Sequence, residues 1–483
     1  MKELTLSKRQ KNITLATVFT VAGVVYCLIS LVNHYLFKTY ALDMGLYTHA
    51  MYDYVHFRID DCSMFRDVPY RILSDHFDLY LVLFSPLIYL FGTYTLPVIQ
   101  IVAVLLGGWG IYKLIGLYTD DEWMPLLASA AFLFSFGVIQ PFGFDYHSNV
   151  VTAMLLPWLL YFIKRGRFGM ASLFVVLFVI GKENMSLWLL FVVIALMWDY
   201  RKDKRALWHL VAYAVFSLAY FFIINMIVMP KLGGAGGGFA RYAHLGENYA
   251  DIAKQLLLNP GETIRMLFIN TTPWTKYDGI KTEFYLCALL SGLLLTLLKP
   301  NYLLMLLPLI AQKMLSIDPN FWGVSVQYSV EFMPVIVIAS FLVIVMLKKQ
   351  VWRIVLASCL LVSTVLTTFY TLGTPKSKVL IDHVCVYQSQ HYEQNQFDFR
   401  YARQLIKQIP DEATVSAASM FVPHLALREQ IYDLDSRPNP HAEYVLITQP
   451  YFDNMVSWKK AFPYRDAYET VATDGTIYLL RRK

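Results

Sequence analysis

Long apolar runs separated by short polar turns dominate the first three quarters of the chain. A transmembrane helix needs about 20 mainly apolar residues, and several runs approach that length. The runs that we place across a bilayer are 13–37, 97–117, 124–140, 150–163, 168–181, 185–198, 207–229, 282–298, 301–315, 330–347 and 352–371. The pattern therefore predicts an α-helical polytopic membrane protein with about eleven spanning helices.

Basic residues at the ends of these runs predict the side on which each loop lies. The basic N-terminus precedes the first run without a small-residue cleavage site, which favours a retained cytoplasmic segment over a removed signal peptide. The basic clusters at 164–167, 201–205 and 348–353 then lie in cytoplasmic loops, as the positive-inside rule expects. Segments 38–96 and 230–281 become outer loops.

The apolar stretch 77–92, "FDLYLVLFSPLIYLFG", does not fit this topology as a span. A twelfth span here would move the later basic loops outside, so we expect it to lie along or partway into the outer leaflet. The second outer loop contains a glycine-rich run, 233–238, without the GK[ST] ending of a nucleotide-binding loop. That run indicates a flexible loop or a mobile lid over a site.

Two consecutive runs, 168–181 and 185–198, are unusually short. A helix of about 14 residues is roughly 21 Å long, against a hydrocarbon core of about 30 Å. The "GKEN" turn between them, residues 181–184, should therefore lie below the outer surface. Lys182 and Glu183 at that depth would face a water-filled cavity or polar partners rather than lipid.

The composition changes after residue 374 and predicts a separate domain. Residues 375–483 contain a helical stretch at 400–410 and short β-rich runs at 413–419, 430–435 and 442–449. A closing hairpin at 468–482 turns at Asp474-Gly475. We expect a transmembrane domain over 1–374 and a small extracytoplasmic α/β domain over 375–483.

Composition supports a membrane protein and excludes several classes. Of the 483 residues, 57% are hydrophobic and only 16% are charged. The net charge of +6 reflects the topology signals just described, so nothing indicates a nucleic-acid partner. Three of the five cysteines fall in apolar runs, which leaves a Cys62–Cys385 disulfide as an open alternative to free thiols.

The candidate chemistry gathers in the outer connections, beginning with "DMGLYTHAMYD". Asp43 is followed by a largely aromatic and apolar sequence that would raise or tune the pKa of its carboxyl group, which favours a catalytic role over a helix cap. Asp53, in a segment expected to be helical along the surface, is more typical of a solvated or capping charge.

Two further connections add ionisable residues close to the membrane surface. Asp145 and His147 suit a divalent metal or a phosphate, with His76 or Glu183 as a third group in space; a capping aspartate and an interfacial histidine are the alternative. Lys182 could neutralise a lipid phosphate while Glu183 orients it, or the two could form an internal pair.

Aromatic and polar residues mix in "SIDPNFWGVSVQYSVEFMP". Gln327 and Tyr328 could hold a sugar by hydrogen bonds and stacking, or the stretch could be an interfacial aromatic belt. Tyr47, Arg241 and Tyr242 in the two outer loops complete the candidate substrate-binding residues.

Six blocks of the chain, in order, resemble a known family: "LDMGLYTHAMYDYVHF", "SDHFDLYLVLFSPLIYLFG", "FGFDYHSNVVTAMLLPWLLYF", "GKENMSLWLL", "SVQYSVEFMPVIVI" and "TVSAASMFVPHLALREQIYDL". They are similar to the bacterial membrane-protein family called domain of unknown function 2079. That family in turn resembles the GT-C superfamily of integral-membrane glycosyltransferases, which take sugar from a polyprenyl-phosphate or polyprenyl-diphosphate carrier.

The resemblance implies roles for particular residues. Asp43 stands at the place of the acidic residue of the first outer loop, which acts as general base on the acceptor, and Asp145 matches the acidic residue of the second. Asp43 is followed by Met44 rather than by a second acid, and "SDHFD" replaces a Lys-Pro-Pro element, so His76 would take over a phosphate contact.

Together these observations predict an enzyme of the bacterial cytoplasmic membrane. It would transfer a sugar from a polyprenyl-phosphate carrier, without a nucleotide, to an extracytoplasmic glycan, lipid or protein acceptor. No cofactor is required by the pattern, although a divalent metal at Asp145 and His147 stays open. The alternatives are a transporter or flippase for a lipid-linked or small anionic substrate, which should place ionisable groups near the bilayer midplane, and a non-catalytic scaffold.

Overall fold

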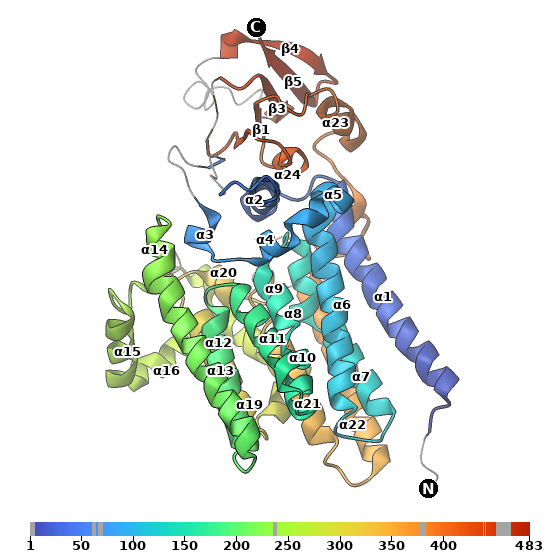
Figure 1. The fold of residues 1–483 in the computed structure, drawn as a ribbon. Coiled ribbons are helices and arrows are strands. Elements are labelled where there is room, and N and C mark those ends of the chain that lie inside the picture. Colours follow the sequence, from blue (N-terminus) through green and yellow to red (C-terminus); the bar gives the residue numbers. More distant parts are fainter. Residues whose placement is uncertain are drawn as a thin grey trace.

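A bundle of helices carries a small sheet domain at one end (Figure 1). The computed structural model describes the following residues: 5–59, 64–65, 71–234, 239–373, 375–376, 383–437, 439, 441–450 and 465–483. The N-terminus lies at the end of the bundle opposite the sheet domain, and the C-terminus lies within that domain (Figure 1).

Several helical segments are long and apolar enough to cross a membrane. Among the described residues they are Lys8–Tyr35, Tyr80–Ile115, Lys204–Lys231, Thr275–Thr296 and Gln350–Gly373, with a sixth candidate in the pair Trp123–Leu133 and Phe136–Gly143, bent by 55°. The shorter apolar helices are Ser148–Lys164, Phe168–Ile180, Met185–Asp199 and Phe332–Ile344. The protein is therefore a helical membrane protein, while the count of eleven spans stays a prediction.

Identifiable breaks explain why some apolar runs form shorter helices than the sequence predicted. Helix α7 (Trp123–Leu133) ends before Ser135, whose extended backbone starts the separate helix α8 (Phe136–Ile139). A π-helical turn, Leu289–Leu293, separates α17 (Ile280–Ala288) from α18 (Leu294–Thr296), and Gly292 within it has a non-helical φ of 122°. Hydropathy does not reveal such breaks, because the residues on both sides remain apolar.

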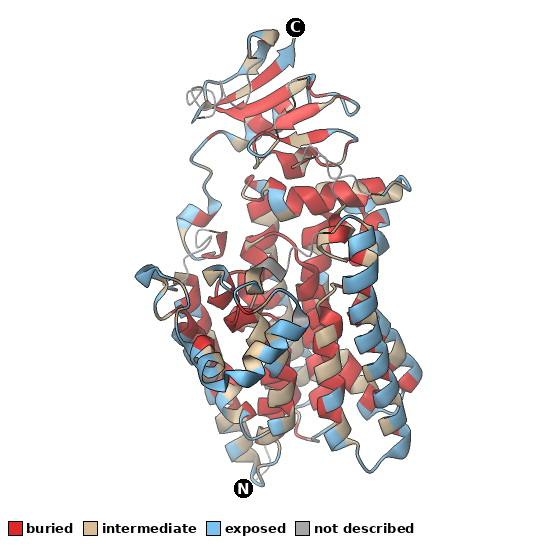
Figure 2. Ribbon diagram, turned by 90° about the vertical axis from the view of Figure 1, so that its left-hand side faces the viewer, coloured by how far each residue is buried: buried red, intermediate tan, exposed pale blue. Residues whose placement is uncertain are grey.

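Helix α21 (Phe332–Ile344) forms the centre of the bundle. Twelve of its residues are buried, and it packs against α7, α18 and α19 (Pro300–Met314). The buried residues extend along the axis of the bundle, whereas the outer faces of peripheral helices are exposed (Figure 2). A helix that is apolar on all sides is expected at such a position.

The segment 77–92 takes a direction different from that of α6 (Thr95–Ile115), as Figure 1 shows. It forms α4 (Tyr80–Phe84), a 3₁₀ turn that contains Pro86, and α5 (Ile88–Phe91), and it ends at Gly92 with a φ of 56°. Tyr89 and Leu90 on α5 are exposed. This arrangement fits a segment that lies along the membrane surface.

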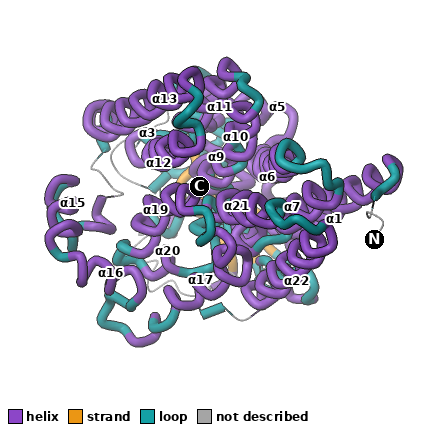
Figure 3. The backbone as a smooth tube through the Cα atoms, turned by 90° about the horizontal axis from the view of Figure 1, so that it is seen from below, coloured by secondary structure: helices purple, strands orange, loops and turns teal. Residues whose placement is uncertain are grey.

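The second outer loop contains more regular structure than a flexible connection. Residues 235–238 of the glycine-rich run lie outside the described part of the chain. Beyond them, the structure has α15 (Tyr249–Leu258), capped by the side chain of Asn248, and α16 (Pro260–Phe268). Both helices lie at the periphery of the bundle when it is viewed along its length (Figure 3).

The C-terminal residues fold into the α/β unit that the sequence predicted. A five-stranded sheet has the order β2-β1-β3-β5-β4. Its strands are β1 (Val415–Ala417), β2 (Ile431–Asp433), β3 (Tyr444–Thr448), β4 (Tyr468–Thr473) and β5 (Ile477–Arg482). The first three strands run parallel, β3 pairs antiparallel with β5 (Val445 opposite Leu480), and the hairpin turns at Gly475, whose φ is 88°.

The sheet domain shares a hydrophobic core with the first outer loop. Met44 and Tyr47 from the loop lie in one buried cluster with Phe421 and Val422 of the sheet domain. An added Cβ at Gly45 would lie 2.9 Å from Val422 Cγ1, so the two segments approach closely. The domain that follows the last helix is therefore packed onto the loop that follows the first.

The remaining described helices are α1 (Lys8–Tyr35), α2 (Leu46–Val55), α3 (Ile72–Asp75), α9 (Ser148–Ala153), α10 (Leu156–Lys164), α11 (Phe168–Ile180), α12 (Met185–Asp199), α13 (Lys204–Ile223), α14 (Met229–Lys231), α20 (Pro319–Trp322), α22 (Gln350–Gly373), α23 (Phe399–Ile406) and α24 (Val422–Leu425). Of the two cysteines considered for a disulfide, Cys62 lies outside the described residues. The thiol of Cys385 is buried and donates a hydrogen bond to the carbonyl of Leu372 at 2.8 Å.

The close packing of α8 against the segment before α21 gives a stability test at Gly137. A Cβ there would lie 2.6 Å from the Ser329 carbonyl oxygen, so Gly137→Ala should destabilise the protein by about 1–3 kcal/mol. Thermal unfolding of the purified protein in detergent measures the effect. Gly169→Ala is the matched control, because nothing lies within 4 Å of its added Cβ, and an equal loss in both variants would contradict the packing.

Candidate functional site

Asp43 lies in a strained turn immediately before α2. Its φ of 66° and ψ of −76° are those of a classic γ-turn, which is rare for a residue with a side chain. The turn is held from outside, because the Ala41 N–H donates to Ser419 Oγ of the sheet domain at 3.1 Å. Strain that surrounding structure maintains is typical of functional sites.

Asp145 is the second strained carboxylate and contacts the Asp43 turn. Its φ is 50°, and its Oδ2 accepts a hydrogen bond from the Met44 N–H at 3.4 Å. Gln100 of α6 fixes the surrounding backbone, since it donates to the Asp145 carbonyl and accepts from the His147 N–H. Burial, together with the negative charge of Asp43, raises the pKa of Asp145 well above its ordinary value.

Two tyrosines lie near Asp43, one in the same loop and one far away in the sequence. Burial raises the pKa of Tyr47, and the charge of Asp43 and a hydrogen bond with it raise this pKa further. The pKa of Tyr328 is also raised, mainly by burial and in part by Asp43. Asp43 therefore lies within electrostatic range of the loop before α21, far from it in the sequence.

The "GKEN" turn pairs with the start of segment 77–92. Glu183 accepts from His76 Nδ1 at 3.2 Å and from the Phe77 N–H at 3.1 Å. Although burial alone would raise it, the charge and the hydrogen bond of His76 lower the pKa of Glu183 to about 2. The carboxylate that we expected to orient Lys182 thus holds His76.

Lys182 lies among several ionisable groups without forming an ion pair with any described residue. It lowers the pKa of Asp78 in part, but burial outweighs this effect and raises that pKa to about 7. Asp78 is 2% exposed and accepts from the Tyr80 N–H at 2.9 Å. The cationic head of Lys182 is therefore available to a negatively charged ligand.

His147 is a buried, neutral histidine. Burial lowers its pKa to about 4 despite the nearby charge of Asp43, and the ring stacks on Phe144 at 5.2 Å. Its Nε2 has no hydrogen-bond partner among the described residues. A neutral imidazole at this position can donate or accept one hydrogen bond but does not bring a positive charge.

Arg241 and Tyr328 belong to one aromatic stack. Phe321 lies between them, 3.8 Å from the Tyr328 ring and 4.6 Å from the Arg241 guanidinium. Tyr242 anchors the same segment by donating to the Gln312 carbonyl at 2.6 Å. Trp322 is fully buried, which does not fit the alternative of an interfacial aromatic belt at this residue.

A buried lysine shapes the loop that carries Gln327 and Tyr328. Lys313 is 2% exposed, and its ammonium donates to the carbonyls of Phe321, Gly323 and Tyr328 at 2.6–3.1 Å. These carbonyl contacts offset the cost of a buried charge. Gln327 is itself buried, and its Oε1 has no partner among the described residues.

Asp53, which we expected to be a solvated or capping charge, is buried. It is 6% exposed, accepts from Arg58 Nε at 3.1 Å, and lies 3.9 Å from His49 Nε2. Arg58 also pairs with Glu429 of the sheet domain at 3.3 Å. Asp53 therefore helps to hold α2 against that domain.

The metal alternative finds no support in the described residues. No group of three or more histidine, cysteine, aspartate or glutamate side chains there could hold an ion. Asp145 is instead occupied by the Met44 N–H, while His76 is occupied by Glu183. We derive no chemistry through a metal.

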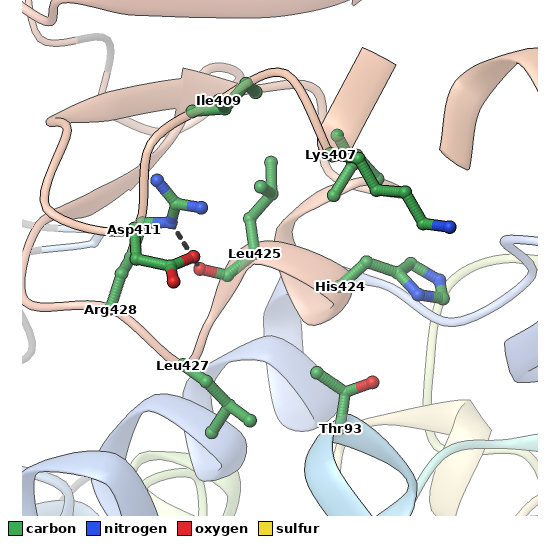
Figure 4. A pocket seen from close by; sticks show the side chains of 9 residues that line it. Thr93, Lys407, Ile409, Asp411, His424, Leu425, Leu427 and Arg428 are labelled. Atoms are coloured by element: carbon green, nitrogen blue, oxygen red, sulfur yellow. Dashed lines mark hydrogen bonds between the residues drawn. The ribbon is translucent and has the colours of Figure 1, made fainter. Parts of the chain in front are cut away.

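A separate cavity of about 360 Å³ lies where the sheet domain meets the start of α6 (Figure 4). Thr93, Lys407, His424 and Arg428 contribute to its lining, and the Arg428 guanidinium donates to the Leu425 carbonyl at 2.9 Å. None of the residues that the sequence singled out lines this cavity. Of the predicted residues, Tyr47, Asp145, His147 and Tyr328 instead interact with Asp43.

Sequence reasoning missed residues that lie inside apolar runs. Gln100 and Lys313 are polar residues within predicted spans, and Asp78 lies two residues after His76. A polar residue in a spanning segment is itself an indication of function or buried pairing. That indication could have identified Gln100 and Lys313 without a structure.

The fold and this site define an integral-membrane protein with a polar site near the end of the bundle that carries the sheet domain. The chain belongs to the DUF2079 family of predicted membrane proteins, whose family model matches residues 33–467, as the sequence resemblance implied. Comparison with curated proteins gives no match.

Solved structures with some similarity to this chain include ArnT and AftD. ArnT from Cupriavidus metallidurans bound to undecaprenyl phosphate has a TM-score of 0.49 and 10% identity, with 97% of each chain covered. The arabinofuranosyltransferase AftD from Mycobacteria has a TM-score of 0.47 and 13% identity, covering 99% of this chain and 40% of AftD. Similarities of this size leave the activity to be argued from the residues of this chain.

The raised pKa of Asp78 predicts a pH-dependent stability. The unfolded chain loses this proton near pH 4 and the folded protein near pH 7, so the folded protein becomes relatively less stable as pH rises between these values. Asp78→Asn keeps an oxygen for the Tyr80 N–H and removes the ionisation. The melting temperature of the variant should exceed that of the parent by an amount that grows from pH 4 to pH 7 and is then constant. Exposed Asp120→Asn is the control, and a difference independent of pH would refute this assignment.

Proposed function

We propose that this protein is a membrane glycosyltransferase that moves a sugar from a polyprenyl-phosphate carrier to an acceptor hydroxyl, with Asp43 as general base. The observation that carries the proposal is the close approach of two strained segments. The Met44 N–H, next to Asp43, donates to Asp145, and the charge of Asp43 helps to raise the pKa of Asp145, so the two carboxylates form an interacting pair. Such a pair separates the roles of base and acid within one site.

The raised pKa of Asp145 supports a division of labour between the two carboxyl groups. A protonated Asp145 can donate a hydrogen bond and leaves Asp43 as the anionic partner. Asp43 would then remove the proton from the acceptor hydroxyl as that oxygen forms its bond to the anomeric carbon. The bond from the anomeric carbon to the phosphate oxygen breaks, and the lipid phosphate leaves with the electron pair.

Lys182 and Arg241 are the groups we assign to the lipid phosphate. Neither is in an ion pair with a described residue, and Arg241 lies in one aromatic stack with Tyr328, which Asp43 influences. His147, as a neutral group, can add a hydrogen bond through Nε2, and Gln327 has a free oxygen for a sugar hydroxyl. In this proposal His76 positions Glu183, which also holds the start of segment 77–92, and does not bind phosphate directly.

Placement favours a transferase over a transporter. Asp43, His76 and His147 adjoin α2, α3 and α9, which lie toward the end of the bundle that carries the sheet domain (Figure 1). A transporter should instead concentrate its ionisable groups near the bilayer midplane. In this proposal the protein resides in the bacterial cytoplasmic membrane, with eleven spans, a cytoplasmic N-terminus and an extracytoplasmic sheet domain.

Asp43→Asn tests the general base. Because a general base contributes about 10²–10⁴-fold to rate, the variant should lose transfer by that factor while folding normally. The assay incubates purified protein in nanodiscs with polyprenyl-phosphate sugars and a panel of glycan and lipid acceptors, and follows release of the polyprenyl phosphate. Asp120→Asn, exposed at a distant loop, is the control; full activity of Asp43→Asn would exclude this base.

Lys182→Met tests the phosphate contact. A charge-assisted hydrogen bond contributes about 1.5–3 kcal/mol, so affinity for a polyprenyl phosphate should fall by roughly 10–100-fold. Lys182→Arg should retain part of the affinity, because the positive charge remains. Direct binding of polyprenyl phosphate measured without turnover gives the result, and unchanged affinity in Lys182→Met would remove this residue from the site.

A further inference from the structure

A second, larger groove lies on the outside of the bundle, between the segment Thr275–Thr296 and α22. It has a volume of about 910 Å³, and its lining is mostly apolar. Leu286 and Leu290 on one wall, and Val362 and Leu366 on the other, are more than half exposed. Apolar side chains exposed in this way on two spanning segments face lipid.

The groove has the length of one membrane leaflet. From Gly279 to Leu290 the lining extends over eleven residue steps, which at about 1.5 Å per step is roughly 17 Å, or about half of a 30 Å hydrocarbon core. The helices meet at its deep end, where Ser363 Oγ donates to the Leu290 carbonyl at 2.8 Å. The opposite end lies where α22 finishes and the chain continues toward the sheet domain.

That end carries a buried carboxylate and a lysine. Glu283 is 5% exposed, and its Oε1 accepts from the Tyr370 hydroxyl at 2.8 Å and from the Lys376 N–H at 2.7 Å. Its Oε2 is buried without a hydrogen-bond partner among the described residues. The lost hydrogen bonds of such an oxygen are costly unless a ligand or water supplies a donor.

Lys376 supplies the opposite charge at the same end of the groove. Its side chain crosses Gly279, where an added Cβ would collide with the ammonium, and it lines the groove. The ammonium is in no ion pair with a described residue. The groove therefore ends in one cationic donor and one carboxylate oxygen that lacks a donor.

We propose that this groove binds one phospholipid, with its phosphodiester at Lys376 and a headgroup hydrogen-bond donor at Glu283. Phosphatidylethanolamine satisfies both protein groups, because its phosphodiester accepts from Lys376 and its ammonium donates to Glu283. The quaternary amine of phosphatidylcholine has the same charge but no N–H to donate. A phosphate monoester, which carries more negative charge and no donor, is opposed by the Glu283 carboxylate. The site is thus suited to a bilayer phospholipid rather than to the unloaded carrier, a polyprenyl phosphate monoester.

This proposal does not depend on the proposed activity. None of the residues assigned to the sugar or its carrier lines the groove. A protein that failed every transfer assay could still bind phosphatidylethanolamine here, and an active transferase could fail to bind it.

Native mass spectrometry of the purified full-length protein tests the site with phosphatidylethanolamine and phosphatidylcholine that have identical acyl chains. One charge-assisted hydrogen bond predicts about tenfold greater retention of phosphatidylethanolamine. Lys376→Met should weaken retention of both lipids, and Glu283→Gln should abolish the preference between them. Leu366→Trp, a change at an exposed lining position, should obstruct the groove and lower the binding of both lipids.

Lys231→Met is the control, since Lys231 is exposed and lies outside the groove. Equal retention of the two lipids by the parent protein would overturn the proposal. Identical retention by the parent and the Leu366→Trp variant would also overturn it. A polyprenyl phosphate that displaces phosphatidylethanolamine from the parent protein would assign the groove to the sugar carrier and refute a phospholipid site.

Discussion

The hydrogen bond from the Met44 N–H to the Asp145 carboxylate is the contact on which the site depends. It joins segments 101 residues apart, each of which carries an aspartate with a left-handed φ. Without the contacts that hold these two segments, both backbones would relax and the two carboxylates would separate. Gln100 holds one segment through two hydrogen bonds, and Ser419 holds the other. The arrangement costs conformational and electrostatic energy that only surrounding structure can offset.

The sheet domain is part of this support. It shares a hydrophobic core with the first outer loop, and Val422 fits against Gly45 so closely that a side chain there would collide. Asp53 and Arg58 add an ion-paired connection to Glu429. The last 110 or so residues therefore shape the site near Asp43 although none of them was among the residues that the sequence singled out for chemistry.

Lysines play two different parts in the bundle. Lys313 is surrounded by backbone carbonyls and fixes the loop before α21, as a bound cation would. Lys281 is similarly buried and donates to the carbonyls of Met266 and Met314. Lys182, in contrast, has no such partners among the described residues. A lysine whose donors are satisfied by the protein is structural, whereas one that lacks acceptors is available to a ligand.

The sequence by itself determined the membrane class, the family, the α/β C-terminal unit and the connections that supply the polar residues. Apolar periodicity, basic clusters and the Asp-Gly turn are local properties, so they can be read residue by residue. Only the tertiary structure decided that Glu183 binds His76, that Asp53 is buried, and that Gln100 and Lys313 organise the site. These outcomes depend on segments far apart in the chain, and the breaks at Ser135 and Gly292 depend on backbone geometry that hydropathy does not record.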